Sequence, residues 1–356
     1  MHRLLLVGIL FFFGPIWVTH AQSPSTSIAY VSLDGENRIA GFELSREGEL
    51  TKKFDVETES PPGGLCMSPD KKYLYASLRR AGKLASFEVG ADTGELRHLT
   101  TVDAGDDPAF VTTDKSGQYL LVAYYVAAKV TVHRLNDGKI QTPPLQIIST
   151  QDKAHAILTD RENRFVFVPH TGPNAIYQFL FDSTKGQLTA NKPAFLATGE
   201  STGPRQFAFH PKLDVVYFDY EQGSAIAAFD LNRESGQLKY RQRLSTLPQK
   251  YVGENTNARI EMASNGKFIY VANRGHDSLA GYAIDQNTGD LSRIGIFPTE
   301  ATPRGFAIDG ESKYLLAAGQ ASDKLAMFAI DRESGKLKRI GTYDVGKRPW
   351  WVLIAK

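Results

Sequence analysis

The chain has 356 residues, of which 41 are Lys or Arg and 39 are Asp or Glu, so its formal net charge at pH 7 is +2. A near-neutral chain with mixed charges lacks the basic surface that nucleic-acid binding requires, so we expect no nucleic-acid partner. The single cysteine, Cys66, excludes an intrachain disulfide. The length is sufficient to bury a large core.

The N-terminus has the features of a secretory signal. The basic tip His2-Arg3 precedes an apolar run over residues 4–18, and Thr19-His20-Ala21 then places small residues three before and one before the expected cut. This pattern predicts a signal peptide over residues 1–21 and an exported mature domain over residues 22–356. No later apolar run is long enough to cross a bilayer, so we expect no membrane span after cleavage.

A short apolar motif, typified by Tyr73-Leu74-Tyr75 and Tyr119-Leu120-Leu121, recurs seven times along the chain. The seven copies cover residues 28–32, 72–77, 118–123, 164–168, 215–218, 267–272 and 313–318. An alternating run suited to a β-strand follows each copy, over residues 39–44, 84–89, 130–135, 175–180, 226–231, 279–284 and 325–330.

A polar turn and an apolar residue then close each repeat. The closing residues are Leu50, Leu96, Ile140, Leu188, Leu238, Leu291 and Leu337. Their spacing of about 44–53 residues is that of a four-stranded propeller blade. Because the first repeat lacks the strand that precedes the motif, residues 350–355 must supply it. The sequence predicts one all-β domain, a seven-bladed β-propeller whose closing blade is completed by the C-terminal strand.

The predicted topology brings many basic residues to one face. In a propeller, the loop before each first strand and the loop after each second strand open on the same face. The residues at these places are Arg79, Tyr124, His155, His170, Arg205, Glu221, Arg259, Arg274, Arg304, Gln320 and Arg348. Six arginines around one carboxylate favour an anionic small molecule, although Arg259, Arg304 and Arg348 also suit ion pairs that brace blades.

Residues 203–221 give this hypothesis its clearest form. If the two apolar runs of this stretch pair around the turn at residues 210–214, Arg205 and Glu221 return to one edge of the sheet. The same two residue types would also occur in an ordinary surface ion pair, which is the alternative interpretation.

The sequence contains no metal-ligand spacing and no nucleotide-binding fingerprint, so we expect neither a metal nor a cofactor.

Several longer stretches resemble the seven-bladed propeller lactonases, a family that includes 6-phosphogluconolactonases and carboxymuconate cyclases. The resemblance covers essentially the whole mature chain and is strongest at residues 203–211, 270–274, 298–306, 313–320 and 345–352. It implies His155, Arg205, Glu221 and Arg274 as catalytic residues. We expect substrate contacts from Arg304, Gln320, Arg259 and His170.

The sequence departs from the family pattern at Lys153, His170, Asn174 and Tyr220, which leaves the substrate open. The first hypothesis is a metal-independent, 6-phosphogluconolactonase-like hydrolase of carbohydrate metabolism that acts as a monomer on a small anionic or sugar-lactone substrate. One alternative is a carboxymuconate-type cycloisomerase. The other is a non-catalytic propeller that binds an extracytoplasmic ligand.

Overall fold

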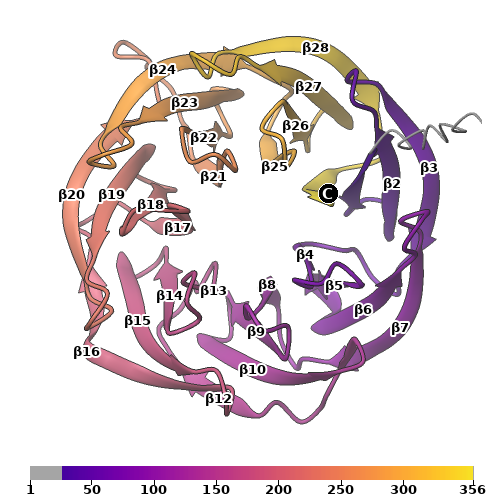
Figure 1. The fold of residues 1–356 in the computed structure, drawn as a ribbon, viewed down its shortest axis with the longest axis vertical. Coiled ribbons are helices and arrows are strands. Elements are labelled where there is room, and N and C mark those ends of the chain that lie inside the picture. The colour runs from indigo at the N-terminus through magenta and orange to yellow at the C-terminus, as the bar shows by residue number, and fades with distance from the viewer. Residues whose placement is uncertain (1–25, 356) are drawn as a thin grey trace, which may run out of the picture.

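The computed structural model describes residues 26–355, which form seven antiparallel sheets arranged as blades around a central axis (Figure 1). The signal peptide predicted for residues 1–21 lies outside the described residues. The innermost strands are β4 (Leu65–Met67), β8 (Pro108–Thr113), β13 (Leu158–Thr159), β17 (Pro204–Phe209), β21 (Asn257–Met262), β25 (Pro303–Ile308) and β29 (Pro349–Ala355).

The second strands lie directly outside them and coincide with the seven repeated motifs. They are β1 (Ser27–Leu33), β5 (Tyr73–Leu78), β9 (Tyr119–Tyr124), β14 (Phe165–His170), β18 (Val215–Tyr220), β22 (Phe268–Asn273) and β26 (Tyr314–Gly319). Every residue of β9, β14, β18, β22 and β26 is buried. Apolar side chains on both faces therefore pack against the two neighbouring blades.

The third strands are β2 (Arg38–Leu44), β6 (Lys83–Val89), β10 (Lys129–Asn136), β15 (Ala175–Asp182), β19 (Ala225–Leu231), β23 (Ser278–Ile284) and β27 (Lys324–Ile330). The outer strands are β3 (Leu50–Glu57), β7 (Leu96–Asp103), β11 (Lys139–Ile140), β12 (Gln146–Ser149), β16 (Gln187–Ala197), β20 (Leu238–Ser245), β24 (Leu291–Pro298) and β28 (Leu337–Asp344). In the third blade, Pro143 and Pro144 separate β11 from β12, since proline cannot donate to a strand ladder.

The predicted closure of the ring is confirmed. The C-terminal strand β29 is the innermost strand of the blade that β1 opens, and pairs with it from Ile28–Ala355 to Val31–Val352. The two ends of the described chain thus share one sheet, which leaves no unpaired edge between the first and last repeats.

Buried tyrosine hydroxyls join neighbouring blades through one recurring contact. Tyr217 donates a hydrogen bond of 2.7 Å to the carbonyl of Gly289 in the next blade, and Tyr270 does the same to Gly335. These glycines end the polar turns before the outer strands and have positive φ values of 79° and 68°. The same contact thus joins the fifth blade to the sixth and the sixth blade to the seventh.

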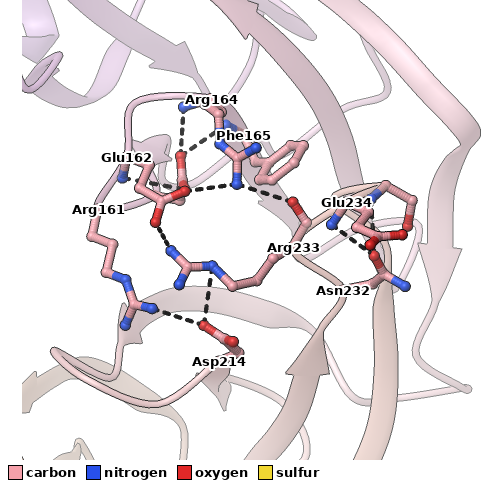
Figure 2. Close-up of polar contacts among 10 residues, drawn as sticks. Arg161, Glu162, Arg164, Phe165, Asp214, Asn232, Arg233 and Glu234 are labelled. Carbon is pink, nitrogen blue, oxygen red and sulfur yellow. Dashed lines mark hydrogen bonds and ion pairs between the residues drawn. The ribbon is translucent and has the colours of Figure 1, made fainter.

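Ion pairs also brace the face opposite the loops that hold the predicted site. Between the fourth and fifth blades, Arg233 contacts both Glu162 and Asp214, and Arg161 donates to Asp214 at 3.0 Å (Figure 2). Because every arginine in this group has a carboxylate or carbonyl partner, we interpret it as a structural contact between blades.

Candidate active site

A β-bulge recurs near the start of the innermost strand in five blades. One extra residue on the inner strand disturbs the register between Pro108 and Phe110, Pro204 and Phe207, Asn257 and Ile260, Pro303 and Gly305, and Pro349 and Trp351. Bulges re-aim side chains, and these bulges contain Arg205, Arg259 and Arg304. The regular repeat thus presents arginines at equivalent places on the innermost strands.

The fifth and sixth blades form the centre of the site. Glu221 directly follows β18, and its Oε2 lies 3.7 Å from Nε of Arg205 on β17. Its other oxygen accepts a hydrogen bond from Arg274, which also donates to the carbonyl of Asn257 at 2.9 Å. The pairing of β17 with β18 therefore brings Arg205 and Glu221 to one edge, as the sequence predicts.

Arg205 is a charged side chain in a nearly closed environment. The residue is only 2% exposed, and its Nε and Nη1 have no hydrogen-bond partner among the described residues. Burial lowers the pKa of Arg205 to about 10, and the Glu221 carboxylate opposes this change. At neutral pH the guanidinium remains charged, with hydrogen-bonding capacity left for a bound oxygen atom.

His155 lies in the fourth blade, between the bridge of Ala154 with His170 and the pair of Leu158 with Phe167. It is 5% exposed, and its Nδ1 has no hydrogen-bond partner in the described chain. Its pKa lies well below the ordinary value, first because of burial and then because of the charges of Arg205, Arg79 and Arg304. His155 is therefore a neutral imidazole at pH 7, able to accept a proton.

Two further arginines complete the basic group around His155 and Arg205. Arg79 donates to Asp107 at 2.8 and 2.9 Å and lies 5.1 Å from the ring centre of Tyr125. Arg304 stacks on Trp350 at 3.6 Å, and none of the ion pairs within residues 26–355 includes it. Burial and the charges of neighbouring arginines lower the pKa of Arg304. An anion beside Arg304 would relieve this repulsion.

The remaining predicted contact residues differ in their surroundings. Arg259 stacks on Trp351 at 3.9 Å and contacts Glu261 and the Gln206 side chain, so much of its charge is already matched. Gln320 follows β26 and is partly exposed, and its backbone N–H donates to the carbonyl of Thr302.

His170 and Arg348 lie in different surroundings from the arginine group. His170 is fully buried, with Nδ1 2.9 Å from the Val168 carbonyl oxygen and its ring against Tyr177. Arg348 pairs with Asp34, which also accepts from Arg80. Arg348 therefore pairs within its own blade, between the ends of β29 and β1, and it is Arg80 that links Asp34 to the second blade.

The sequence reasoning missed Asp219, Asp107 and the two tryptophans beneath the arginines. Asp219 is the clearest omission, because a lone acid within the apolar strand 215–220 is a visible signal. Asp107 stands beside a predicted first strand and the two tryptophans lie within one, but the sequence does not show which arginine each one contacts.

Within residues 26–355, no group of three or more His, Cys, Asp or Glu side chains could hold a metal ion. The same residues include no helix long and apolar enough to cross a membrane.

Fold and site together define a seven-bladed propeller that holds a group of arginines around Glu221, and comparison with known proteins gives its family. The family described as "Lactonase, 7-bladed beta-propeller" matches residues 17–354. The chain therefore belongs to the seven-bladed β-propeller lactonases.

Solved structures share the complete fold at low sequence identity. A periplasmic gluconolactonase of Pseudomonas aeruginosa is 24% identical with a TM-score of 0.87, covering 93% of this chain and 99% of that one. A putative 6-phosphogluconolactonase of Bacteroides fragilis is 23% identical with a TM-score of 0.86, covering 94% and 99%. A similar putative enzyme of Bacteroides uniformis is 23% identical, with a TM-score of 0.84 and coverage of 92% and 99%.

Proposed function

We propose that the protein is a lactonase that opens the ring of a sugar-acid lactone with water. The observation that carries the proposal is the group formed by Arg205, Glu221 and Arg274 in a chain of the lactonase family. Lactone hydrolysis requires an activated water, stabilisation of the oxyanion and a proton for the leaving alkoxide. The group of His155, Arg205, Glu221 and Arg274 contains residues suited to each task.

His155 is the proposed proton acceptor. Burial and nearby arginines lower its pKa, so the ring is neutral and available as a base at pH 7. It would take a proton from water as the oxygen attacks the lactone carbonyl. Because the same surroundings make the imidazolium unstable, the proton would then pass to the more basic alkoxide oxygen as the ring carbon–oxygen bond breaks.

Arg205 and Arg274 are the proposed binders of the oxyanion or of a substrate carboxylate. A guanidinium binds such oxygens through two parallel N–H groups, and Arg205 has two nitrogens without a partner in the described chain. Glu221 contacts both arginines and fixes their relative position. It is also the second group in the site that can exchange a proton.

Hydrolysis of glucono-δ-lactone in ¹⁸O-labelled water tests the reaction class. We expect one solvent oxygen in the product and a loss of kcat/KM of about 100-fold in His155→Gln. A cycloisomerase incorporates no solvent oxygen, so an unlabelled product would refute hydrolysis. Full activity in His155→Gln would remove this residue from the proton transfer.

We also propose that the protein is exported and that its substrate lacks a phosphate. The support is the signal-peptide pattern of residues 1–21 and the structural similarity to a protein described as a periplasmic gluconolactonase. Phosphorylated sugar lactones form inside cells, whereas sugar oxidation outside the cytoplasmic membrane yields unphosphorylated ones.

The test compares kcat/KM for gluconolactone with and without the 6-phosphate. A preference of about 1000-fold for the phosphate ester, or about 4 kcal/mol of transition-state binding, would contradict the proposal.

A further inference from the structure

Asp219 is the exceptional residue of the second strands. The equivalent position in each blade lies opposite the second residue of the third strand. In the seven blades it holds Ser32, Ser77, Ala123, Pro169, Asp219, Ala272 and Ala318. Only Asp219 is ionisable, and it is fully buried in an otherwise apolar strand. A buried carboxylate carries a large desolvation cost, so its presence requires a reason.

Its first contact is with the bulge that contains Arg205. The Asp219 Oδ1 accepts a hydrogen bond of 2.6 Å from the backbone N–H of Gln206. Because the bulge places Arg205 and Gln206 opposite Asp219 alone, this N–H lacks the regular ladder partner. The carboxylate therefore closes the bulge that aims Arg205.

The second blade shows that this hydrogen bond does not require a charge. There, Ser77 occupies the equivalent position, and its Oγ accepts the N–H of Gly64 at 2.9 Å. A neutral hydroxyl thus performs the same backbone role without the cost of burying an ion. The charge of Asp219 must therefore be explained by its surroundings in the fifth blade.

Those surroundings are unusually rich in charged groups. Burial, and to a smaller extent Glu221, raises the pKa of Asp219, whereas Arg205 on β17 and Arg274 after β22 favour its ionised form. Arg259 on β21 reaches the Gln206 side chain, and β19 places the apolar Ile226 opposite Asp219. Glu221 and Asp219 are thus two acids beside Arg205 and Arg274. The second oxygen of Asp219 has no hydrogen-bond partner in the described chain.

We propose that Asp219 is a positioning residue of this site: it fixes the Arg205 bulge and supplies a second negative charge that holds the Arg205 guanidinium in place. This inference rests on the proposed function, since Arg205 is the proposed binder of the oxyanion. Burial raises the pKa of Asp219 from 3.8 to about 7 against the opposing effect of Arg205, so the charge of Asp219 changes near neutral pH.

Two variants separate the hydrogen bond from the charge. Asp219→Ser reproduces the arrangement of the second blade and keeps an acceptor for Gln206, whereas Asp219→Ala removes the acceptor and the charge together. Ser32→Ala is the matched control, because Ser32 occupies the equivalent position and its buried Oγ has no partner in the described chain. Its kinetics should match the wild type.

The measurement is kcat and KM for glucono-δ-lactone from pH 5.5 to 8.5, corrected for spontaneous hydrolysis. Above pH 7 we expect Asp219→Ser to lower kcat about 10-fold, because Arg205 loses its second counter-charge. Because glucono-δ-lactone is uncharged when it binds, its KM should change little. The difference in kcat should disappear at pH 5.5, where the wild-type carboxyl is protonated. Equal kcat for Asp219→Ser and wild type across this range would overturn the proposal.

Crystal structures of wild type and Asp219→Ser above pH 7 keep the inference testable even if the lactone is not a substrate. We expect the bulge to persist and the Arg205 guanidinium to move from its position 3.7 Å from Glu221. An unmoved Arg205 would refute the positioning role. Absence of lactone turnover by the wild type, with Arg205 displaced in the variant, would refute the proposed function alone.

Discussion

His170 should make the protein sensitive to acid, and its surroundings give the magnitude. The side chain is fully buried, its Nδ1–H donates to the Val168 carbonyl, and its Nε2 has no hydrogen-bond partner in the described chain. Burial lowers its pKa from 6.5 to about 4, against smaller opposing effects of the hydrogen bond to Val168 and of Asp152. This difference corresponds to about 3 kcal/mol of folding free energy.

The sign follows from proton uptake by the two states. Between pH 6.5 and pH 4 the unfolded chain binds a proton at His170 that the folded chain does not bind, so stability falls as the pH falls. Above pH 7 both states are neutral at this position, and the contribution to the free energy of unfolding is constant. Asparagine at position 170 offers an N–H near the position of Nδ1 but does not titrate.

The assay is urea unfolding of wild type and His170→Asn between pH 7.5 and pH 4, followed by tryptophan fluorescence. Apart from Trp17 in the predicted signal peptide, the only tryptophans are Trp350 and Trp351 on the innermost strand β29. The wild type should lose about 3 kcal/mol more than the variant over this range. His98→Asn, at an exposed ring on β7, is the control and should follow the wild-type curve.

Parallel pH curves for wild type and His170→Asn would refute this reasoning. The same variant addresses the substrate contact that the sequence predicts for His170. A buried ring bonded to its own strand should change kcat/KM less than about 3-fold when replaced, whereas a substrate contact should raise KM about 10-fold or more.

Three further predictions concern the site, the blade contacts and the compartment. Glu221→Gln should lower turnover about 100-fold if Glu221 transfers a proton, and single-turnover kinetics on glucono-δ-lactone measure this; full activity would exclude that role. Tyr217→Phe should lower the free energy of unfolding by about 1–3 kcal/mol, because the Gly289 carbonyl loses its 2.7 Å partner; an unchanged urea midpoint and slope would show that the contact is dispensable. Fractionation of cells that express a tagged full-length chain should find a processed protein outside the cytoplasm, and an unprocessed cytoplasmic protein would contradict the signal-peptide prediction.

The sequence alone determined the architecture because each repeat carries its own pattern. A motif such as Tyr217-Phe218, a polar turn and a closing residue such as Leu238 specify three strands, and seven copies leave only one way to complete the ring. The repeat also fixes which loops share a face. Because of their positions within the repeats, His155, Arg205 and Arg274 lie on the same face of the ring.

Only the tertiary structure decided how the charges are matched. Arg205 and Arg274 share Glu221, whereas Arg348 pairs with Asp34 across the joined ends of the chain. Side-chain partners depend on distances between blades, which strand patterns do not encode. The role of Asp219 is likewise hidden in the sequence, because it depends on a bulge that leaves the Gln206 N–H without a ladder partner. Burial and neighbouring charges, which set the pKa values of His155 and Asp219, exist only once the blades are packed together.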